Sequence, residues 1–480
     1  MPPSQHLKGL APLTFLDQTS ARMYIVFHCA FEINDRRLAI ESLRAGVNTL
    51  FSACPILAGA VVLEQNGLNK YRIVAGTDVP DEDGCPFLQV KEHDCSTSTI
   101  LIPPWPQGGG VDHRPPSYGV SSESFAPLVS VAPDGQRQPV LRFQANIMTD
   151  GLVLTMSLHH FFADGTGAGL VLEALGECCR CAPSPSSFLS HAVDKANLSL
   201  VSKLAQEETH LRERVLNTRG LYSDNAHVPN CRDKTPNATD KTSPLPPPSV
   251  PRKFMFPADR IRHLKTACNN LLPDARVSSN DVLTALLATA MHDTMEPRGP
   301  PSTTLMMAVD LRRRLSPPRY DSYLGNMATF LHVPITRLSS PLDVITRAMG
   351  SNRMSSHELQ QIAEVALRIR QGLPTINEQF ICNLIESKRD PTLSDWAPPS
   401  PFNIFISSWR HMRPYHVNFG PALGHIDAFE MNPVPVNGTV VVMPPQRGDH
   451  PLFEVNIALS DTKQFDALYK KWLFGLDCPN

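Results

Sequence analysis

The sequence lacks the features that would place it in or across a membrane. Its longest apolar runs, which end at Leu63 and Met291, contain nine and ten residues, whereas a membrane-spanning helix needs about 20. The N-terminus has no basic start followed by an apolar core and a small-residue cleavage site, so it does not match a secretory signal peptide. We therefore expect a cytoplasmic protein that does not bind membranes.

An excess of either charge is also missing. Lys and Arg number 44 against 46 Asp and Glu, which gives a formal net charge of -2 at pH 7. This balance argues against generic attraction to nucleic acid or to an anionic membrane surface. The 11 cysteines are odd in number and scattered, which indicates reduced thiols rather than a disulfide framework. Specificity must therefore come from a local site.

Several common catalytic motifs are absent from the sequence. It contains no G-x-S-x-G nucleophile elbow, no phosphate-binding G-x-x-x-x-G-K loop, no dinucleotide-binding G-x-G-x-x-G and no H-E-x-x-H. Hydrolase, kinase and dehydrogenase functions therefore lose their usual support.

Cys178 and Cys181 form a C-x-x-C, but no second pair follows and the local pattern is helical, so we interpret these thiols as packing residues.

The chain is long enough for two lobes and contains a proline-rich break between them. Its 480 residues exceed the size at which one hydrophobic core keeps growing. Residues 225–252 are polar and proline-rich with almost no periodicity, which is typical of an exposed crossover. We therefore predict an N-terminal lobe over residues 1–224 and a C-terminal lobe over residues 253–480.

Local patterns predict a mixture of helices and strands in both lobes. Strand-like runs occupy residues 22–33, 139–148, 152–161, 304–311 and 402–409, and helical patterns occupy residues 37–53, 166–181 and 278–293. Asp150 and Gly151 suit a tight hairpin turn between two of the strands. These patterns indicate an α/β fold.

The sharpest chemical signal is the segment "HHFFADG", from His159 to Gly165, which ends an expected strand and leads into an expected helix. A histidine is the natural general base near neutral pH, because its reference pKa lies close to the working range. His160 is therefore the candidate base. We expect Asp164 to brace the loop through a basic partner, and Gly165 to let the backbone turn sharply.

Two other interpretations of the histidine pair remain open from the residues alone. Two histidines and an aspartate could bind a metal ion, but adjacent strand residues point to opposite faces, so His159 and His160 should not both reach one ion. Both histidines could instead be hydrogen-bonded core residues at a strand end. Alternation suggests that one histidine serves each purpose, and we expect no metal.

The motif resembles the HxxxDG signature of the BAHD acyltransferases, and the wider pattern is similar to their fungal relatives around the trichothecene 3-O-acetyltransferases. Further landmarks run in the family's order across most of the chain. They include a P-x-L-A-G segment, an S-T-N-D-like helix, a V-x-x-R-x-R block ending in Y-x-G-N, and an S-S-W segment; with the opening strand, these lie at residues 13–33, 50–62, 278–287, 309–326 and 406–424.

The resemblance implies a two-lobed fold like that of chloramphenicol acetyltransferase, with mixed sheets, flanking helices and a channel between the lobes. Acyl-CoA, expected to be acetyl-CoA, would enter from one face as a co-substrate, and an acceptor alcohol or amine would enter from the other. His160 would deprotonate the acceptor, which attacks the thioester carbonyl directly. The resemblance implies no permanently bound cofactor, and we expect a monomer.

The resemblance also assigns supporting residues. Asp164 would pair with Arg312 as a structural brace, because an unpaired buried carboxylate costs several kcal/mol. Ser407 and Trp409 match family positions near the reacting carbonyl, where a hydroxyl and an indole N–H would donate to the developing oxyanion. For Trp409, ordinary burial of a large aromatic side chain is an equal alternative.

The chain departs from the family at its second signature, D-F-G-W-G. Asn418, Phe419 and Gly420 occupy the first three positions, a proline and an alanine follow, and Gly424 is displaced. The departure argues against a tight turn and a CoA contact in this segment. It also leaves two alternatives open, which are a condensation-domain-like enzyme that uses carrier-protein thioesters and a non-catalytic binding protein on a decayed acyltransferase fold.

Arg252 and Lys253 follow the expected crossover directly. Their charges could meet the CoA phosphates, and a solvated surface pair is the alternative.

Overall fold

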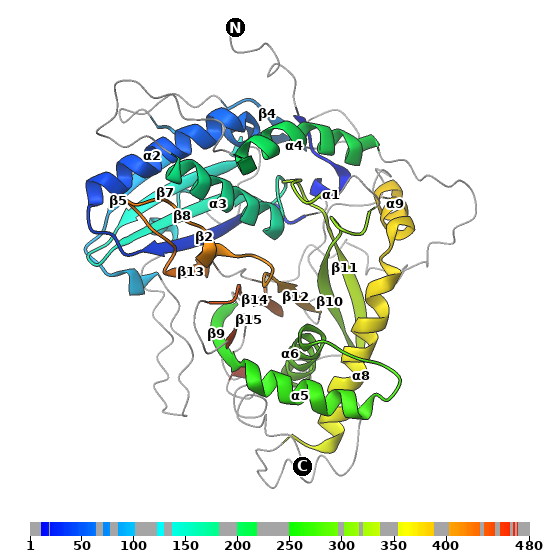
Figure 1. Ribbon diagram of the computed structural model, residues 1–480. Helices are drawn as coiled ribbons and strands as arrows, with labels where there is room; N and C mark the ends of the chain where they lie inside the picture. The colour runs from blue at the N-terminus through cyan, green and yellow to red at the C-terminus, as the bar shows by residue number, and fades with distance from the viewer. Residues whose placement is uncertain are drawn as a thin grey trace, which may run out of the picture.

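The protein is seen as two lobes in a computed structural model (Figure 1). No helix among the described residues is long and apolar enough to span a bilayer. The structure describes residues 11–18, 20–63, 71–76, 85–100, 122–128, 137–181, 199–217, 249–295, 302–315, 320–336, 354–387, 403–432, 436–446, 452–460, 464–465 and 468.

The N-terminal lobe is built on a five-stranded sheet with the order β13-β2-β8-β7-β5. β7 and β8 form the expected hairpin, and its turn is closed by a hydrogen bond from Met148 N–H to the Gly151 carbonyl at 2.9 Å. The strands are β2 (Tyr24–Phe31), β5 (Leu88–Glu92), β7 (Leu141–Ile147), β8 (Leu152–His159) and β13 (Ala428–Met431). A smaller sheet holds β1 (Ala11–Pro12), β3 (Ala60–Leu63), β4 (Tyr71–Val74) and β6 (Gln138–Pro139).

Helices cover one face of the large N-terminal sheet (Figure 1). They are α2 (Arg36–Ala53), α3 (Gly165–Arg180) and α4 (Ser199–Asn217), while the short α1 (Phe15–Gln18) precedes the sheet in sequence. Alternate residues of β8, namely Leu152, Leu154, Met156 and Leu158, belong to the apolar core of this lobe. The period-2 pattern of an amphipathic strand thus directs one face to the helices.

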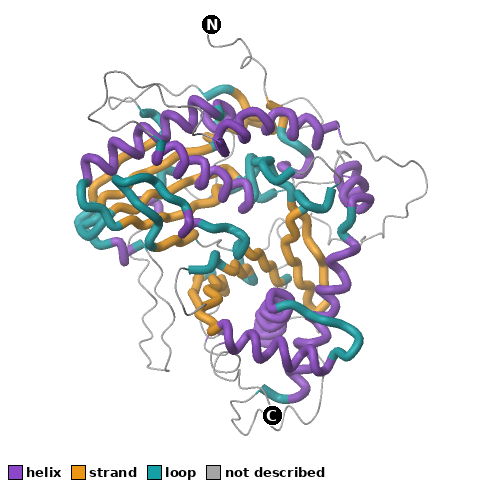
Figure 2. Tube along the Cα trace, viewed as in Figure 1, coloured by secondary structure: helices purple, strands orange, loops and turns teal. Residues whose placement is uncertain are grey.

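The C-terminal lobe is built on a six-stranded sheet with the order β11-β10-β12-β14-β15-β9. Its central strands β10, β12 and β14 are parallel, and the other pairs are antiparallel. The strands are β9 (Val250–Pro257), β10 (Ser302–Asp310), β11 (Ala328–Thr336), β12 (Ile404–Ser408), β14 (Thr439–Val442) and β15 (Leu452–Leu459). The helices are α5 (Ala258–Leu271), α6 (Ser279–Met295), α8 (Ser356–Gly372) and α9 (Glu378–Ser387); Figure 2 separates the helices from the sheets by colour.

Local sequence signals explain where the key helices begin. Asp164 caps α3, since its side chain accepts a hydrogen bond from Gly167 N–H at 2.9 Å. Ser278 and Asp281 cap α6 reciprocally, with Ser278 N–H donating to the Asp281 carboxylate at 2.7 Å. The strands and helices expected from the sequence are thus present, with ends that differ by a few residues.

One strand crosses between the halves of the chain. β13 lies far beyond residue 253 in sequence, yet it pairs with β2 in the sheet of the N-terminal lobe. Figure 1 shows it as an orange strand at the edge of that sheet. β9 begins at Val250, so the last residues of the predicted crossover form a strand, while residues 225–248 lie outside the described part of the chain. The lobes are therefore joined by a shared sheet as well as by the crossover.

Candidate active site

His160 lies in the turn between β8 and α3. Its backbone N–H donates to the Met23 carbonyl at 2.8 Å, and its carbonyl accepts from the Asn326 side chain at 2.8 Å. The residue is half-buried, and its Nδ1 atom is buried without a hydrogen-bond partner. Burial lowers the pKa of His160, although its own backbone carbonyl and the Asp164 charge act in the opposite direction. The ring is therefore neutral near pH 7, the form that can accept a proton.

His159 has the opposite environment. It is fully buried, and both of its ring nitrogens are engaged. Because Nδ1 accepts the Phe161 N–H at 3.1 Å, Nε2 carries the proton and donates to the Gln138 side-chain oxygen at 2.6 Å. Burial, together with the neighbouring His160 and Arg22, lowers the pKa of His159 to about 3. Its contacts are those of a structural residue with no nitrogen left for a substrate or an ion.

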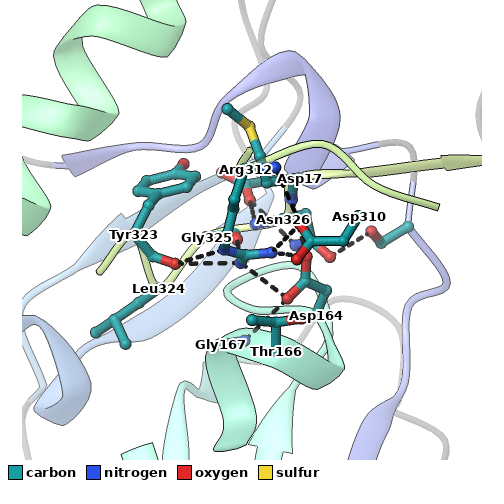
Figure 3. Close-up of polar contacts among 12 residues, drawn as sticks. Asp17, Asp164, Thr166, Gly167, Asp310, Arg312, Tyr323, Leu324, Gly325 and Asn326 are labelled. Atoms are coloured by element: carbon teal, nitrogen blue, oxygen red, sulfur yellow. Dashed lines mark hydrogen bonds and ion pairs between the residues drawn. The ribbon is translucent and has the colours of Figure 1, made fainter. Parts of the chain in front are cut away.

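Asp164 and Arg312 form a buried, bidentate ion pair across the two lobes (Figure 3). The NH1 and NH2 groups of Arg312 each donate to one carboxylate oxygen of Asp164 at 2.9 Å. Arg312 also donates to the carbonyls of Tyr323 and Gly325, and Asp164 also accepts from Met327 N–H at 2.9 Å. Burial alone would raise the pKa of Asp164, but Arg312 and these hydrogen bonds outweigh it and lower that pKa.

Ser407 and Trp409 meet the start of α3 from the end of β12. The indole N–H of Trp409 donates to Ser407 Oγ at 3.2 Å, so it is already engaged, while the indole packs edge-on against Phe27 at 5.2 Å between ring centroids. A Cβ atom on Gly165 would lie 3.0 Å from the indole Nε1. Gly165 begins α3 directly after the turn and has no positive φ, so its close packing on Trp409, rather than an unusual backbone conformation, favours glycine here.

The first turn of α3 makes further inter-lobe contacts that the sequence did not reveal. A Cβ atom on Gly167 would lie 2.0 Å from the Leu324 carbonyl oxygen, so only glycine fits this approach. Thr166 Oγ1 and His411 Nε2 lie 2.9 Å apart, in a hydrogen bond between the lobes. The glycines of the segment were visible in the sequence, but the backbone facing them was not.

The altered second signature lies elsewhere. Gly420 has a φ of 87° and Gly424 a φ of 71°, and the Asn418 side chain accepts from Gly420 N–H at 2.8 Å. Phe419 is fully buried, and its N–H donates to the Gly424 carbonyl at 2.8 Å. The argument against a tight turn is therefore wrong, because Asn418 and the displaced glycine form one.

The turn of the second signature contacts the far end of α3. Gly176 packs against the Asn418 carbonyl, since a Cβ atom on Gly176 would lie 3.4 Å from that oxygen. Gly176 lies 11 residues along α3 from Gly165, which corresponds to roughly 16 Å at helical rise. The structure thus brings His160, Asp164, Gly165, Arg312, Ser407 and Trp409 into one linked region, and leaves Asn418, Phe419 and Gly420 outside it.

The basic residues after the crossover do not form a phosphate site. Lys253 is paired with Glu430 and with Glu454, the latter at 3.0 Å, and it is 8% exposed. Arg252 is 5% exposed. Both expectations, a CoA contact and a solvated pair, are therefore wrong for Lys253, since its charge is neutralised inside the protein.

No group of three metal-ligating side chains occurs among the described residues.

Fold and site together define a two-lobed acyltransferase of the chloramphenicol acetyltransferase type. The Transferase family matches residues 117–465, and a trichothecene 3-O-acetyltransferase-like N-terminal domain matches residues 22–179. The chain belongs to this Transferase family, the BAHD acyltransferases, and it is an acyl-CoA-dependent O- or N-acyltransferase of fungal secondary metabolism.

Two curated relatives are named for different acceptor atoms, an oxygen and a nitrogen. The chain is 33% identical to fumigaclavine B O-acetyltransferase of Aspergillus fumigatus, over 90% of this chain and 89% of the relative. It is 31% identical to communesin N16 acyltransferase of Penicillium expansum, with the same coverage of both chains, 90% and 89%. One relative is thus named for an oxygen acceptor and the other for a numbered nitrogen position.

Solved structures share the fold. TRI101 of F. sporotrichioides, complexed with coenzyme A and T-2, superposes with a TM-score of 0.68 at 19% identity, covering 97% of this chain and 98% of that one. Vinorine synthase superposes with a TM-score of 0.63 at 16% identity, covering 98% and 95%. A condensation domain of the CDA synthetase gives 0.51 at 14% identity, covering 98% and 96%. The match is higher for the stand-alone enzymes.

Proposed function

We propose that this enzyme transfers an acetyl group from acetyl-CoA to a hydroxyl or amine of a fungal small molecule, with His160 as the general base. The observation that carries the proposal is the contrast between the two adjacent histidines. His159 has both nitrogens engaged inside the sheet, whereas His160 is half-buried, its Nδ1 atom has no hydrogen-bond partner, and burial lowers its pKa so that the ring is neutral. A neutral, partly exposed imidazole at a helix start is suited to accept a proton.

The proposed reaction is a direct transfer. The His160 ring takes the proton from the acceptor O–H or N–H as the acceptor atom bonds to the thioester carbonyl carbon. The carbonyl oxygen becomes an oxyanion, and when the C–S bond breaks the protonated ring returns its proton to the CoA thiolate. The products are the acetylated acceptor and free CoA, and no acyl-enzyme is formed.

Ser407 is the proposed donor to the oxyanion. Its Oγ already accepts the Trp409 indole N–H at 3.2 Å, so its own O–H is left to donate. Trp409 therefore acts on the oxyanion through Ser407, which revises the expectation that both groups donate directly. Removing one such donor typically slows catalysis about 100- to 1,000-fold.

Asp164, Gly165 and Arg312 support the site without touching the substrate in this proposal. The ion pair and the helix cap hold the turn that carries His160, and Gly165 admits the indole that orients Ser407. Asn418, Phe419 and Gly420 stabilise the far end of α3, which assigns the altered signature to folding rather than to CoA binding.

The remaining parts of the proposal concern the setting of the enzyme. We retain two lobes over residues 1–224 and 253–480, except that β13 belongs to the N-terminal sheet, with a channel between the lobes, and a monomer that works in the cytoplasm. The nine cysteines in the described ranges are free thiols, which supports a reducing compartment.

The test is a product assay with a matched pair of variants. The purified protein is incubated with acetyl-CoA and a panel of alcohols and amines that includes fumigaclavine B, while free thiol is followed and products are identified by mass spectrometry. We expect His160→Ala to lose about a hundredfold or more in kcat. The control His416→Ala removes an exposed histidine and should keep wild-type activity. Equal rates for wild type and His160→Ala would rule out the proposed base.

A further inference from the structure

The sheet of the C-terminal lobe has a side that points away from its helices at β10, β11 and β12. On the helix side, alternate residues such as Leu305 and Ile406 belong to the apolar core that includes residues of α6 and α8. The residues between them point to the opposite side. They are half-buried and comprise Met306, Ala308, Phe330, Phe405 and Ser407. We call these residues the open face.

Two phenylalanine rings meet in the middle of the open face. Phe330 on β11 and Phe405 on β12 flank β10, and their rings pack edge to face with 5.3 Å between the centroids and an angle of 71°. Phe330 lies opposite Ala308 in the strand register. Because the side chain of Ala308 is small, the rings can meet above β10. The result is an apolar surface that crosses three strands, which is about 10 Å at the usual strand spacing.

The open face leads to the proposed reaction centre. Ser407, the proposed oxyanion donor, lies two residues beyond Phe405 on β12, so both side chains point to the same side of the sheet. Beside Ser407 lies Val441 of β14, which belongs to the apolar core of the N-terminal lobe. Figure 1 shows β12 and β14 on the side of the C-terminal lobe that faces the N-terminal sheet. A molecule on the open face therefore lies between the lobes, with one end beside Ser407.

The chemistry of the open face suits an apolar acceptor better than acetyl-CoA. β10, β11 and β12 contain no Lys or Arg, whereas CoA phosphates are held by cations or by backbone N–H groups. The pantetheine arm of CoA carries amides, which lose water without gaining partners on an apolar surface. The acetyl group is too small to cover three strands. A ring system, in contrast, packs well against the faces and edges of phenylalanine rings.

We propose that the open face binds the acceptor, and that Phe330 and Phe405 select a molecule with an apolar, fused-ring body whose hydroxyl or amine reaches the reaction centre beside Ser407. The inference names the substrate class of the proposed acetyltransferase and so rests on that function. Met306 adds an adaptable thioether contact. Phe330 and Phe405 act on the binding of the acceptor and do not take part in proton transfer.

The direct test is the binding of a fused-ring alcohol. The probe is naphthylethanol, and butanol is the matched alcohol without a ring. Dissociation constants are measured by isothermal titration calorimetry for wild type, His160→Ala, Phe330→Ala and Phe405→Ala. We expect wild type and His160→Ala to bind naphthylethanol at least about tenfold more tightly than butanol, and each phenylalanine variant to lose about tenfold in affinity for naphthylethanol. Butanol binding should stay unchanged.

A matched control separates this effect from a general loss of stability. Phe87→Ala removes another half-buried phenylalanine with an aromatic partner, since its ring stacks on Phe51 in the N-terminal lobe at 3.9 Å. It should lower the unfolding temperature and leave naphthylethanol binding unchanged. Phe330→Leu and Phe405→Leu keep apolar bulk without the ring, so they should give intermediate losses. They replace the alanine variants should those not fold.

Turnover gives a second readout. With naphthylethanol as the acceptor, Phe330→Ala and Phe405→Ala should raise the KM for the acceptor, while the KM for acetyl-CoA stays at the wild-type value. A raised KM for acetyl-CoA with unchanged naphthylethanol binding would overturn the inference and assign the open face to the donor. Equal affinities of wild type for the two alcohols, or an unchanged affinity in both phenylalanine variants, would overturn it as well.

The outcomes separate this inference from the proposed function. Binding needs no proton transfer, so an active His160→Ala would remove the proposed base and leave the binding result standing. A wild-type protein that binds naphthylethanol through Phe330 and Phe405 but releases no thiol from acetyl-CoA would count against the proposed function alone.

Discussion

Two buried charged clusters join the lobes, and they are built differently. In the Arg312 cluster, near the site, Arg312 pairs with the buried Asp164 and also donates to Asp310 Oδ1 at 3.1 Å, and backbone groups take the other hydrogen bonds of the pair. In the Lys253 cluster, the single cation of Lys253 serves both Glu430 and Glu454. Each cluster thus has two carboxylates for one cation, but the Asp310 side chain is 42% exposed, whereas those of Glu430 and Glu454 are 2% and 3% exposed. The Arg312 cluster carries the turn of the candidate base.

The difference in burial of the second carboxylate gives the two clusters opposite responses to pH. Burial would raise the pKa of Asp164, but Arg312 lowers it below the usual value, so ionised Asp164 stabilises the fold. Burial raises the pKa of Glu430, and the second glutamate adds to that effect beyond what Lys253 offsets. Ionised Glu430 therefore costs stability. In the Arg312 cluster water screens the second carboxylate, whereas in the Lys253 cluster the second carboxylate is buried beside the first.

The largest effect is expected from breaking the Arg312 cluster. Arg312→Ala leaves the Asp164 carboxylate buried without its cation, which should cost about 3–5 kcal/mol in the free energy of unfolding. Arg312→Lys keeps the charge but not the bidentate geometry, so its free energy of unfolding should lie between those of wild type and Arg312→Ala. Urea denaturation at pH 7 measures both. A loss below about 1 kcal/mol for Arg312→Ala would show that the pair is not the brace described here.

Breaking the Lys253 cluster should cost less. Lys253→Met also removes the cation from buried carboxylates, but Glu430 already has a raised pKa and can take up a proton instead of remaining charged. We therefore expect a smaller loss at pH 7 than for Arg312→Ala, and a still smaller one at pH 5. Equal losses for the two variants at both pH values would mean that the clusters do not differ as described.

Packing at the start of α3 gives an intermediate prediction. Gly167→Ala puts a methyl group 2.0 Å from the Leu324 carbonyl, so the lobes must move apart. The expected cost is about 1–3 kcal/mol, with a loss of activity because the turn of His160 moves with α3. The control is Gly424→Ala, whose Cβ meets nothing within 4 Å and whose cost comes only from its φ of 71°. Thermal unfolding and thiol release should separate the two: Gly424→Ala retains activity.

A pH series tests the opposite responses directly. For Glu430 the folded pKa lies above the usual 4.5, so the folded state binds more protons and stability falls as pH rises through that window. Glu430→Gln should remove this fall. For Asp164 the folded pKa lies below the usual 3.8, so its contribution is present above that value and is lost as pH falls below it. Urea midpoints from pH 3 to 7 give both slopes; an unchanged slope in Glu430→Gln would contradict the assignment.

The smallest effect on stability is expected where one hydrogen bond is removed without a charge. Trp409→Phe keeps the packing on Phe27 and Gly165 but loses the N–H donor to Ser407, which should cost about 0.5–1.5 kcal/mol of stability. Activity should fall more than stability suggests, because the Ser407 hydroxyl loses its orientation. In a Ser407→Ala background, Trp409→Phe should have no further effect on kcat. An additional loss there would mean that the indole acts on the oxyanion directly.

Local signals in the sequence predicted much of the fold. The hairpin of β7 and β8 and the helix after it follow from alternation, a turn dipeptide and helical spacing, all of which act over neighbouring residues. β13 could not be found in this way, because its pairing with β2 joins residues about 400 positions apart. Its four residues carry no local mark of the partner strand.

The candidate site shows the same limit. Order along the chain and resemblance pointed to His160, Asp164 and Arg312, because these residue types form a recognisable motif. Asp17 and Asn326 lie in segments that resemble the family, but the sequence assigned them no role. Nothing in either segment shows that the Asn326 side chain donates a hydrogen bond to the buried Oδ1 atom of Asp17. The sequence also did not reveal the hydrogen bond from the Trp409 indole N–H to Ser407 Oγ, because that bond depends on the rotamers of both side chains.

By itself the sequence determined that this chain forms an α/β acyltransferase with a histidine-pair motif at a strand end, since residue types, periodicity and motif order are properties of the chain. Only the tertiary structure decided that the ring nitrogens of His159 are engaged, and why glycines stand at Gly165 and Gly167. His159 meets Gln138 of β6, and the two glycines face Trp409 and the Leu324 carbonyl from the other half of the chain. These contacts exist only in the folded chain, because the segments that make them are far apart in the sequence.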